Sequence, residues 1–157
     1  MSPATPSSSR AILGQVKVSY PRLLRLLVPL DFSGKSRQAL RYAVPIAQKF
    51  SARIHLVHVL PAPGKADKEE AIRQRTTALK RLGDMAGQLL PPRLRAEYVV
   101  LTGKPADEIL RLAGRNSIDL IVLTTKGRSG LKRALVGSTA ESIMRHAPCP
   151  VMSVRRV

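Results

Sequence analysis

Five apolar segments of strand length alternate with helical patterns along this 157-residue chain. Strands are expected at residues 23–30, 53–60, 94–101, 118–123 and 150–155. The second of these segments is apolar almost throughout, which is typical of a parallel sheet with both faces covered. The repeated alternation predicts a three-layer α/β fold, in which helices cover both faces of an open, mostly parallel five-stranded sheet.

The intervening helices are expected at residues 34–50, 68–90 and 106–116, and a last helix opens after Gly137. Ser33 is a candidate N-cap for the first helix, and Ser138 or Thr139 can cap the last one or donate a hydroxyl to a phosphate oxygen. Pro45 predicts a kink or a break in the first helix, because proline lacks the N–H that would continue the helical hydrogen bonds.

A glycine-rich loop joins the fourth strand to the last helix and carries Gly127, Gly130 and Gly137. Such a loop can bind phosphate, because glycines admit close backbone approach and the first helical amides have no partner inside the helix. Many glycine-rich loops bind no ligand, so this pattern alone leaves both interpretations open.

Topology points to the same loop as a ligand site. Open parallel sheets bind ligands beyond the carboxyl ends of their strands, where the strand order reverses. We expect that reversal between the first and fourth strands, whose ends carry Asp31 and the glycine-rich loop. Topology and anion-binding chemistry together predict a crevice for a ligand of the adenine-nucleotide type.

The chain is strongly basic, with 27 Lys and Arg against 10 Asp and Glu and a formal net charge of +17. A charge of this size favours anionic partners such as a nucleotide, a nucleic acid or an acidic membrane surface. The basic residues are spread along the chain, however, and only 3% of residues are aromatic, which supplies a base-stacking platform poorly. A basic surface that is merely solvated is therefore the alternative.

The remaining composition bounds the class of protein. Cys149 is the single cysteine, so no internal disulfide is expected, and no apolar run reaches the length of a membrane-spanning helix. We expect a cytoplasmic protein. Residues 1–22 are rich in Ser, Pro and Thr and predict a flexible N-terminal tail, with an organelle-targeting segment as the alternative. Residues 23–157 form the expected domain.

Several segments resemble the universal stress protein family. VPLDFS at 28–33, LVHVL at 56–60, GKPADEIL at 103–110 and the long segment 119–155 carry the resemblance, which covers about residues 23–156. It implies a sheet in the order 3-2-1-4-5 and a homodimer that pairs the strand at 150–155 of each copy. It also implies a stress-response protein that binds ATP or AMP, with Mg²⁺ where ATP is bound, as a sensor or switch.

The resemblance also implies which residues form the site. The family motif Gly-x2-Gly-x9-Gly-[Ser/Thr] begins here at Thr124, so a threonine replaces the first glycine. Asp31 is expected on the ribose or base side and the backbone of Val59 at the adenine. The glycines and hydroxyls of the loop are expected at the phosphates. The full expected set is Pro29, Asp31, Val59, Thr124, Gly127, Gly130, Gly137, Ser138 and Thr139.

No catalytic set and no metal site are expected. The crevice has no recognisable nucleophile–base pair and no paired carboxylates, so hydrolysis would be slow at most. His55 and His58 have opposite parity in their strand and cannot hold one metal together, so we expect them to be core or capping histidines. Thr124 keeps a second interpretation open, a dimeric interaction module that binds no nucleotide. Association of the basic surface with RNA or membrane is a third.

Overall fold

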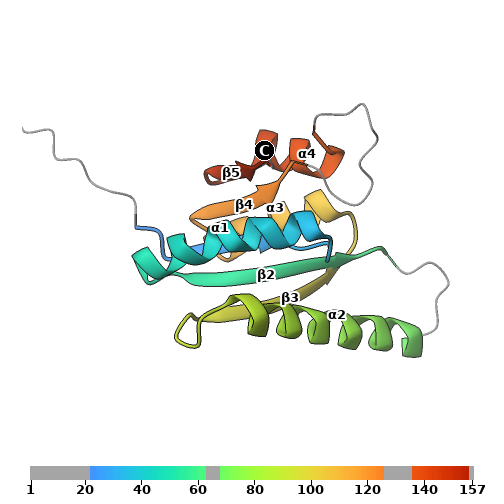
Figure 1. The fold of residues 1–157 in the computed structure, drawn as a ribbon. Coiled ribbons are helices and arrows are strands. Elements are labelled where there is room, and N and C mark those ends of the chain that lie inside the picture. The colour runs from blue at the N-terminus through green and yellow to red at the C-terminus, as the bar shows by residue number, and fades with distance from the viewer. Residues whose placement is uncertain (1–21, 63–67, 126–135, 156–157) are drawn as a thin grey trace, which may run out of the picture.

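The computed structural model describes residues 22–62, 68–125 and 136–155. Nearly all of the expected tail at 1–22, and the candidate site residues Gly127 and Gly130, lie outside these ranges. The described strands form one parallel sheet in the order β3-β2-β1-β4-β5 (Figure 1), which confirms the expected order. The strands are β1 (Arg25–Pro29), β2 (Arg53–Leu60), β3 (Ala96–Thr102), β4 (Leu120–Thr124) and β5 (Val151–Val154).

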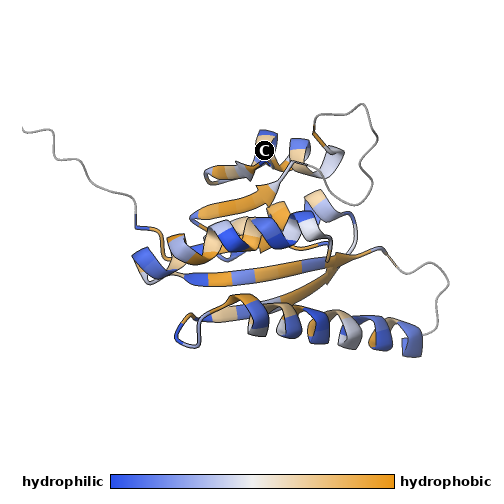
Figure 2. Cartoon of the chain, in the orientation of Figure 1, coloured by the Kyte–Doolittle hydropathy of each residue, from blue (hydrophilic) through white to orange (hydrophobic). Residues whose placement is uncertain are grey.

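Four helices cover the two faces of the sheet, as expected. They are α1 (Gly34–Phe50), α2 (Lys68–Leu89), α3 (Pro105–Arg115) and α4 (Ser138–His146). Leu26 and Val28 of β1 point into a core under α1 and α2, while Leu27 points into a second core under α3 and α4. Hydrophilic and hydrophobic bands alternate along α1 and α2 in Figure 2, as expected of helices with one face on a sheet.

The helix starts confirm one expected cap and correct another. Ser33 caps α1: its Oγ accepts a hydrogen bond from the Ser36 amide at 3.2 Å. The expectation that Ser138 or Thr139 caps α4 is wrong, because the N-cap is Gly137 and both hydroxyl residues lie inside the helix. Gly137 has φ −76° and ψ 151°, the extended backbone that an N-cap requires. The side chains of Ser138 and Thr139 are therefore not occupied by capping.

Pro45 does not break α1. The helix runs continuously from Gly34 to Phe50 with Pro45 on its exposed side. Water can hydrate the carbonyl that loses its helical partner there, which limits the cost of the missing N–H. The break is excluded and the kink stays a prediction.

Strand β4 begins two residues later than the apolar pattern indicates. The strand was expected from residue 118, yet it starts at Leu120, because Asp119 serves as a clamp between two strands. Its Oδ2 accepts hydrogen bonds from the amides of Leu24 and Arg25, at 2.8 and 2.9 Å. The carboxylate thus fixes the entrance of β4 beside the entrance of β1.

None of the helices in the described ranges is both long enough and apolar enough to cross a membrane.

One titratable side chain is buried in the sheet. His55 is 3% exposed, and its Nδ1 lies 3.0 Å from Glu97 Oε2 without the geometry of a hydrogen bond. Burial lowers the pKa of His55 below its ordinary value of 6.5, and Arg53 and Arg25 act in the same direction, while Glu97 opposes them. The folded protein therefore holds His55 neutral at pH values where the unfolded chain protonates it.

This difference predicts a specific pH dependence of stability. As pH falls below about 6.5, the unfolded chain binds more protons than the folded one, so the free energy of unfolding should decrease. Denaturant unfolding of the unchanged chain and of His55→Gln, between about pH 5 and 8, measures the effect. The variant should show the flatter pH profile. Parallel profiles would contradict the assignment to His55.

Candidate functional site

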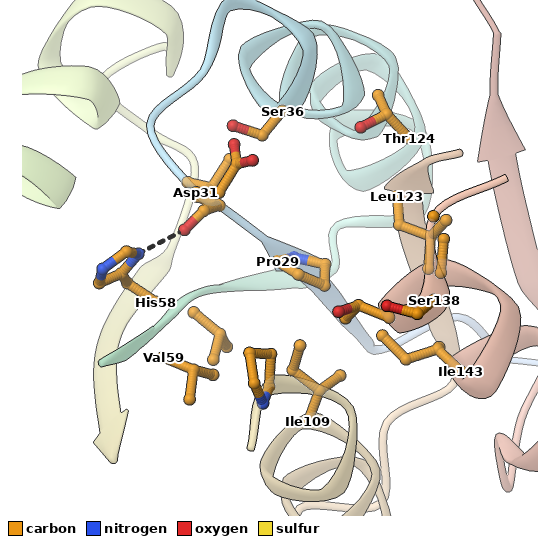
Figure 3. A pocket seen from close by; sticks show the side chains of 16 residues that line it. Pro29, Asp31, Ser36, His58, Val59, Ile109, Leu123, Thr124, Ser138 and Ile143 are labelled. Carbon is orange, nitrogen blue, oxygen red and sulfur yellow. Dashed lines mark hydrogen bonds between the residues drawn. The ribbon is translucent and has the colours of Figure 1, made fainter. Parts of the chain in front are cut away.

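A cavity of about 270 Å³ lies beyond the carboxyl ends of β1, β2 and β4, at the point where the strand order reverses. Small-molecule sites usually have volumes of about 300–1,000 Å³, so this cavity is near the lower end of that range. Seven of the nine expected site residues line it (Figure 3), and the other two are Gly127 and Gly130 in the undescribed segment. The seven are Pro29, Asp31, Val59, Thr124, Gly137, Ser138 and Thr139.

The turn after β1 forms one wall of the cavity. Asp31 Oδ1 accepts a hydrogen bond from the Ser33 amide at 2.9 Å, which holds the carboxylate against the start of α1. Phe32 between them has φ 62°, a left-handed conformation that few residues other than glycine, Asn and Asp adopt. Because such strain persists only where the surroundings enforce it, the turn presents Asp31 in a fixed position.

Val59 offers its backbone to the cavity. The β1–β2 register ends at Pro29 beside Val57, and the Leu30 amide makes the last bond, to Val57 O at 2.7 Å. Backbone groups alternate in direction along a strand, so those of Val59 point the same way as those of Val57. In the described residues β1 has ended at that level, and the N–H and C=O of Val59 therefore face the cavity rather than a neighbouring strand.

The start of α4 forms the opposite wall. The Gly137 amide donates to Thr125 O at 2.6 Å, so this N–H is already engaged. The first helical hydrogen bond runs from the Glu141 amide to Gly137 O at 2.9 Å, which leaves the amides of Ser138 and Thr139 without a partner inside the helix. These two amides, at the positive end of the helix, are the groups suited to an anion.

An apolar lining joins the two walls, and the sequence analysis did not identify it. It includes Val57, Ile109, Leu123 and Ile143, all buried, from one helix or strand each. Each residue looked like an ordinary core position, and only the packing of α3 beside α4 brings them to one cavity. No sequence signal separates them from the rest of the core.

His58 is the polar lining residue that the sequence analysis interpreted as a core or capping histidine. Its Nδ1 lies 2.6 Å from Leu30 O and donates to that carbonyl, and its ring packs on Phe32 with the centroids 4.3 Å apart. The capping part of the interpretation agrees with this bond, because the Leu30 carbonyl lies just after the end of β1. Its position at the end of β2 was the signal that it could also reach a ligand.

Thr124 occupies the first motif position without backbone strain. It ends β4 and is half-buried, and its φ is not positive, unlike those of Phe32, Ser51 and Ser117 among the described residues. A glycine is therefore not required here for its conformation. In Figure 3 Thr124 lies on the same side of the cavity as Ser36 and Asp31.

The chemistry of the cavity is that of a binding site with a mostly apolar wall and one carboxylate. Among its described lining residues there is no Lys or Arg, and Asp31 is the single carboxylate. Within the described ranges no three His, Cys, Asp or Glu side chains are grouped so that they could hold a metal. Backbone amides, hydroxyls and shape are the features available to recognise a ligand.

A family model and a sequence relative both point to the same protein family. The family model described as "Universal stress protein family" matches residues 23–155. A universal stress protein of Methanocaldococcus jannaschii is 34% identical over 146 residues, covering 84% of this chain and 82% of the relative.

Two solved structures share the fold and contain a nucleotide. A universal stress protein in complex with cAMP has a TM-score of 0.67 at 21% identity, covering 86% of this chain and 98% of that one. The universal stress protein from Archaeoglobus fulgidus in complex with dAMP has a TM-score of 0.64 at 22% identity, covering 86% and 100%.

The conformation of Thr124 yields a test of the altered motif. Thr124→Gly should lower the free energy of unfolding by about 0.5–1 kcal/mol, because glycine in a strand loses more conformational entropy and gains no relief from strain. Denaturant unfolding measures this difference. A stabilised variant would mean that threonine is strained at this position.

Proposed function

The chain belongs to the universal stress protein family, and we propose that it binds an adenine nucleotide, ATP or AMP, in the cavity beyond β1, β2 and β4. The observation that carries the proposal is that two sets of backbone groups without a hydrogen-bond partner in the described structure lie across one apolar cavity from each other. The backbone of Val59 lies at one end, and the first amides of α4 lie at the other. The nucleotides in the two related structures support this ligand class.

The base belongs at the β2 end in this proposal. A purine presents both a hydrogen-bond donor and an acceptor along one edge, which matches the N–H and C=O of Val59. The apolar side chains of Val57 and Ile109 suit the faces of the base. The ribose then lies near Asp31, whose carboxylate is held by the Ser33 amide.

The phosphates belong at the start of α4. The amides of Ser138 and Thr139 and their hydroxyls can donate to phosphate oxygens, and the helix dipole favours the negative charge. With ATP, Mg²⁺ would be held mainly by the phosphates and water, since Asp31 is the one carboxylate among the described lining residues.

We propose a sensor or switch rather than an efficient enzyme. Fast hydrolysis needs a positioned base and groups that stabilise the charge of the transition state. The described lining residues supply no paired carboxylates and no cation, so slow hydrolysis is the most that they support. The alternative is an interaction module that binds no nucleotide, and Thr124 in place of the first motif glycine is the reason to consider it. Thr124 adopts its conformation without a positive φ, and the cavity that it lines is still present. We therefore favour nucleotide binding.

The role of the α4 amides can be tested with one substitution. Ser138→Pro removes the amide while keeping the helix, because proline is tolerated at the first helical position and Gly137 already has the extended backbone that precedes a proline. ATP binding measured by isothermal titration should weaken about tenfold or more, since a hydrogen bond to a charged group contributes about 1.5–3 kcal/mol.

Two controls separate the amide from other effects. Ser138→Ala keeps the amide and removes the hydroxyl, so it should weaken ATP binding less than Ser138→Pro does. Adenosine lacks the phosphates, and its affinity should be the same for all three proteins. No ATP binding by the unchanged chain at millimolar concentration would overturn the proposed function, and equal ATP affinity of Ser138→Pro would overturn the phosphate position.

We also propose that the protein forms a homodimer through β5 and its flanks, residues 150–155. In the described residues β5 pairs with β4 on one side only, and Met152 on it is exposed. The Ile121 amide donates a hydrogen bond to Pro150 O, so the backbone groups of Pro150 face β4. Backbone direction alternates along a strand, so the N–H and C=O of Met152 also face β4, and those of Val151 and Ser153 face the open edge. A second copy could continue the sheet there.

Ser153→Pro tests this arrangement. Proline is tolerated on an edge strand when the lost N–H points away from the sheet, so the fold should persist while pairing with a second copy is blocked. Sedimentation velocity should show a shift from dimer to monomer, with Ser153→Ala as the matched control that stays dimeric. A dimer of unchanged stability in Ser153→Pro would exclude the β5 interface.

A further inference from the structure

The described lining of the nucleotide cavity does not account for the net charge of +17. No Lys or Arg is among the described residues that line that cavity, so the cations of the described structure lie elsewhere. The helix α1 concentrates part of it. Its 17 residues contain four cations and no acid, and the four are Lys35, Arg37, Arg41 and Lys49.

The cations of α1 have no ionic partner in the described structure, whereas each of the other helices has at least one cation in an ion pair. In the described structure none of the four forms an ion pair, and Arg37 makes one long contact, 3.5 Å to Gln88 Oε1. Each of the other three helices contains at least one internal pair. These pairs include Arg73–Glu70 in α2, Arg111–Glu108 in α3 and Arg145–Glu141 in α4.

The placement of three of these charges opposes the stability of α1 itself, while Lys49 in the last turn suits the helix dipole. Lys35 and Arg37 lie in the first turn, where the helix dipole favours acids, and the first turns of α2, α3 and α4 do carry acids. Arg37 and Arg41 are four residues apart and repel each other on the same side of the helix. Local rules broken in this way point to a functional reason for the charges.

Exposed aromatic side chains accompany the cations. Lys35, Tyr42 and Lys49 follow one another at intervals of seven residues and therefore form one stripe, with a rise of about 10 Å from one residue to the next. Tyr42 is 49% exposed and Phe50, beside Lys49, is 47% exposed. Single-strand binding proteins combine cations that contact phosphates with aromatic side chains on which bases stack, and this stripe supplies both.

We propose that the exposed face of α1 binds single-stranded nucleic acid, with phosphates on Lys35, Arg37, Arg41 and Lys49 and a base stacked on Tyr42. Charge complementarity identifies the partner as a polyanion. A membrane surface fits less well, because binding in a bilayer interface requires a broad apolar face, and Gln38, Pro45 and Gln48 share the outward side of α1 with the cations. The site is independent of the proposed nucleotide site.

The test uses fluorescence anisotropy with a labelled oligothymidylate of about 20 nucleotides, longer than the roughly 4–16 nucleotides of common single-strand sites. Four phosphate contacts predict that log Kobs falls with log salt at a slope of about −2.8. The triple variant Lys35→Gln, Arg41→Gln, Lys49→Gln should bind at least about tenfold more weakly near 100 mM salt and reduce the slope to about −0.7.

A matched triple variant removes the same charge from other surfaces. Lys68→Gln, Arg93→Gln and Arg115→Gln alter exposed cations in α2, in the turn before β3 and in α3, none of which is in an ion pair of the described structure. This control should bind within about threefold of the unchanged chain at the same salt, because it leaves the α1 contacts in place. Thermal melts followed by circular dichroism check that both variants are folded.

Tyr42→Ala isolates the stacking contact. It should weaken binding about tenfold while leaving the salt slope unchanged, because the lost interaction is with a base and not with a phosphate. Saturating ATP should leave oligonucleotide binding unaltered, which separates the α1 face from the cavity.

Several outcomes would overturn the proposal. Equal weakening by the two triple variants would indicate diffuse charge rather than a site on α1. Competition by ATP would place the oligonucleotide in the cavity. Binding to phosphatidylserine vesicles without binding to the oligonucleotide would identify a membrane-binding surface instead.

Discussion

The early end of β1 is the constraint on which the candidate site depends. β1 is the central strand and pairs with β2 on one side and β4 on the other, yet its register with β2 stops at Pro29 while β2 continues to Leu60. The Leu30 amide makes the final bond to Val57, and the chain then turns through Asp31 into α1. One short strand thus leaves the Val59 backbone open, positions Asp31 and separates β2 from β4 widely enough for a cavity.

Much of this arrangement could be predicted because it depends on local sequence patterns. The bounds of β2 and α1 and the Ser33 cap follow from hydrophobic periodicity and capping chemistry, and the structure confirms them. The strand order came from family resemblance, because periodicity alone does not specify which strands are neighbours. The cap of α4 was predicted wrongly, because a hydroxyl residue after glycine resembles a cap, while the extended backbone of Gly137 takes that role instead.

The apolar half of the cavity could not be predicted for a physical reason. Ile109 and Ile143 have the same helical spacing as residues that only fill the core, and both belong to the core under α3 and α4. What makes them lining residues is that α3 and α4 pack beside each other at the carboxyl ends of the strands, so that both isoleucines border one cavity together with Val57 and Leu123. Which core residues line the cavity depends on how the helices pack across the sheet, and the spacing of apolar residues in one helix does not specify this.

The glycine motif likewise needs its backbone geometry before it can be interpreted. Gly137 is not in a left-handed conformation, so a positive φ does not explain the glycine. Its amide donates to Thr125 O, so this N–H is also not free to bind a ligand. Its engagement holds the loop end against β4 and thereby orients α4, whose next amides remain open to the cavity. The two proposed anion sites therefore differ in mechanism. The cavity would use a helix terminus, with no lysine or arginine among the described lining residues. The α1 face would use side-chain charges that no described acid neutralises.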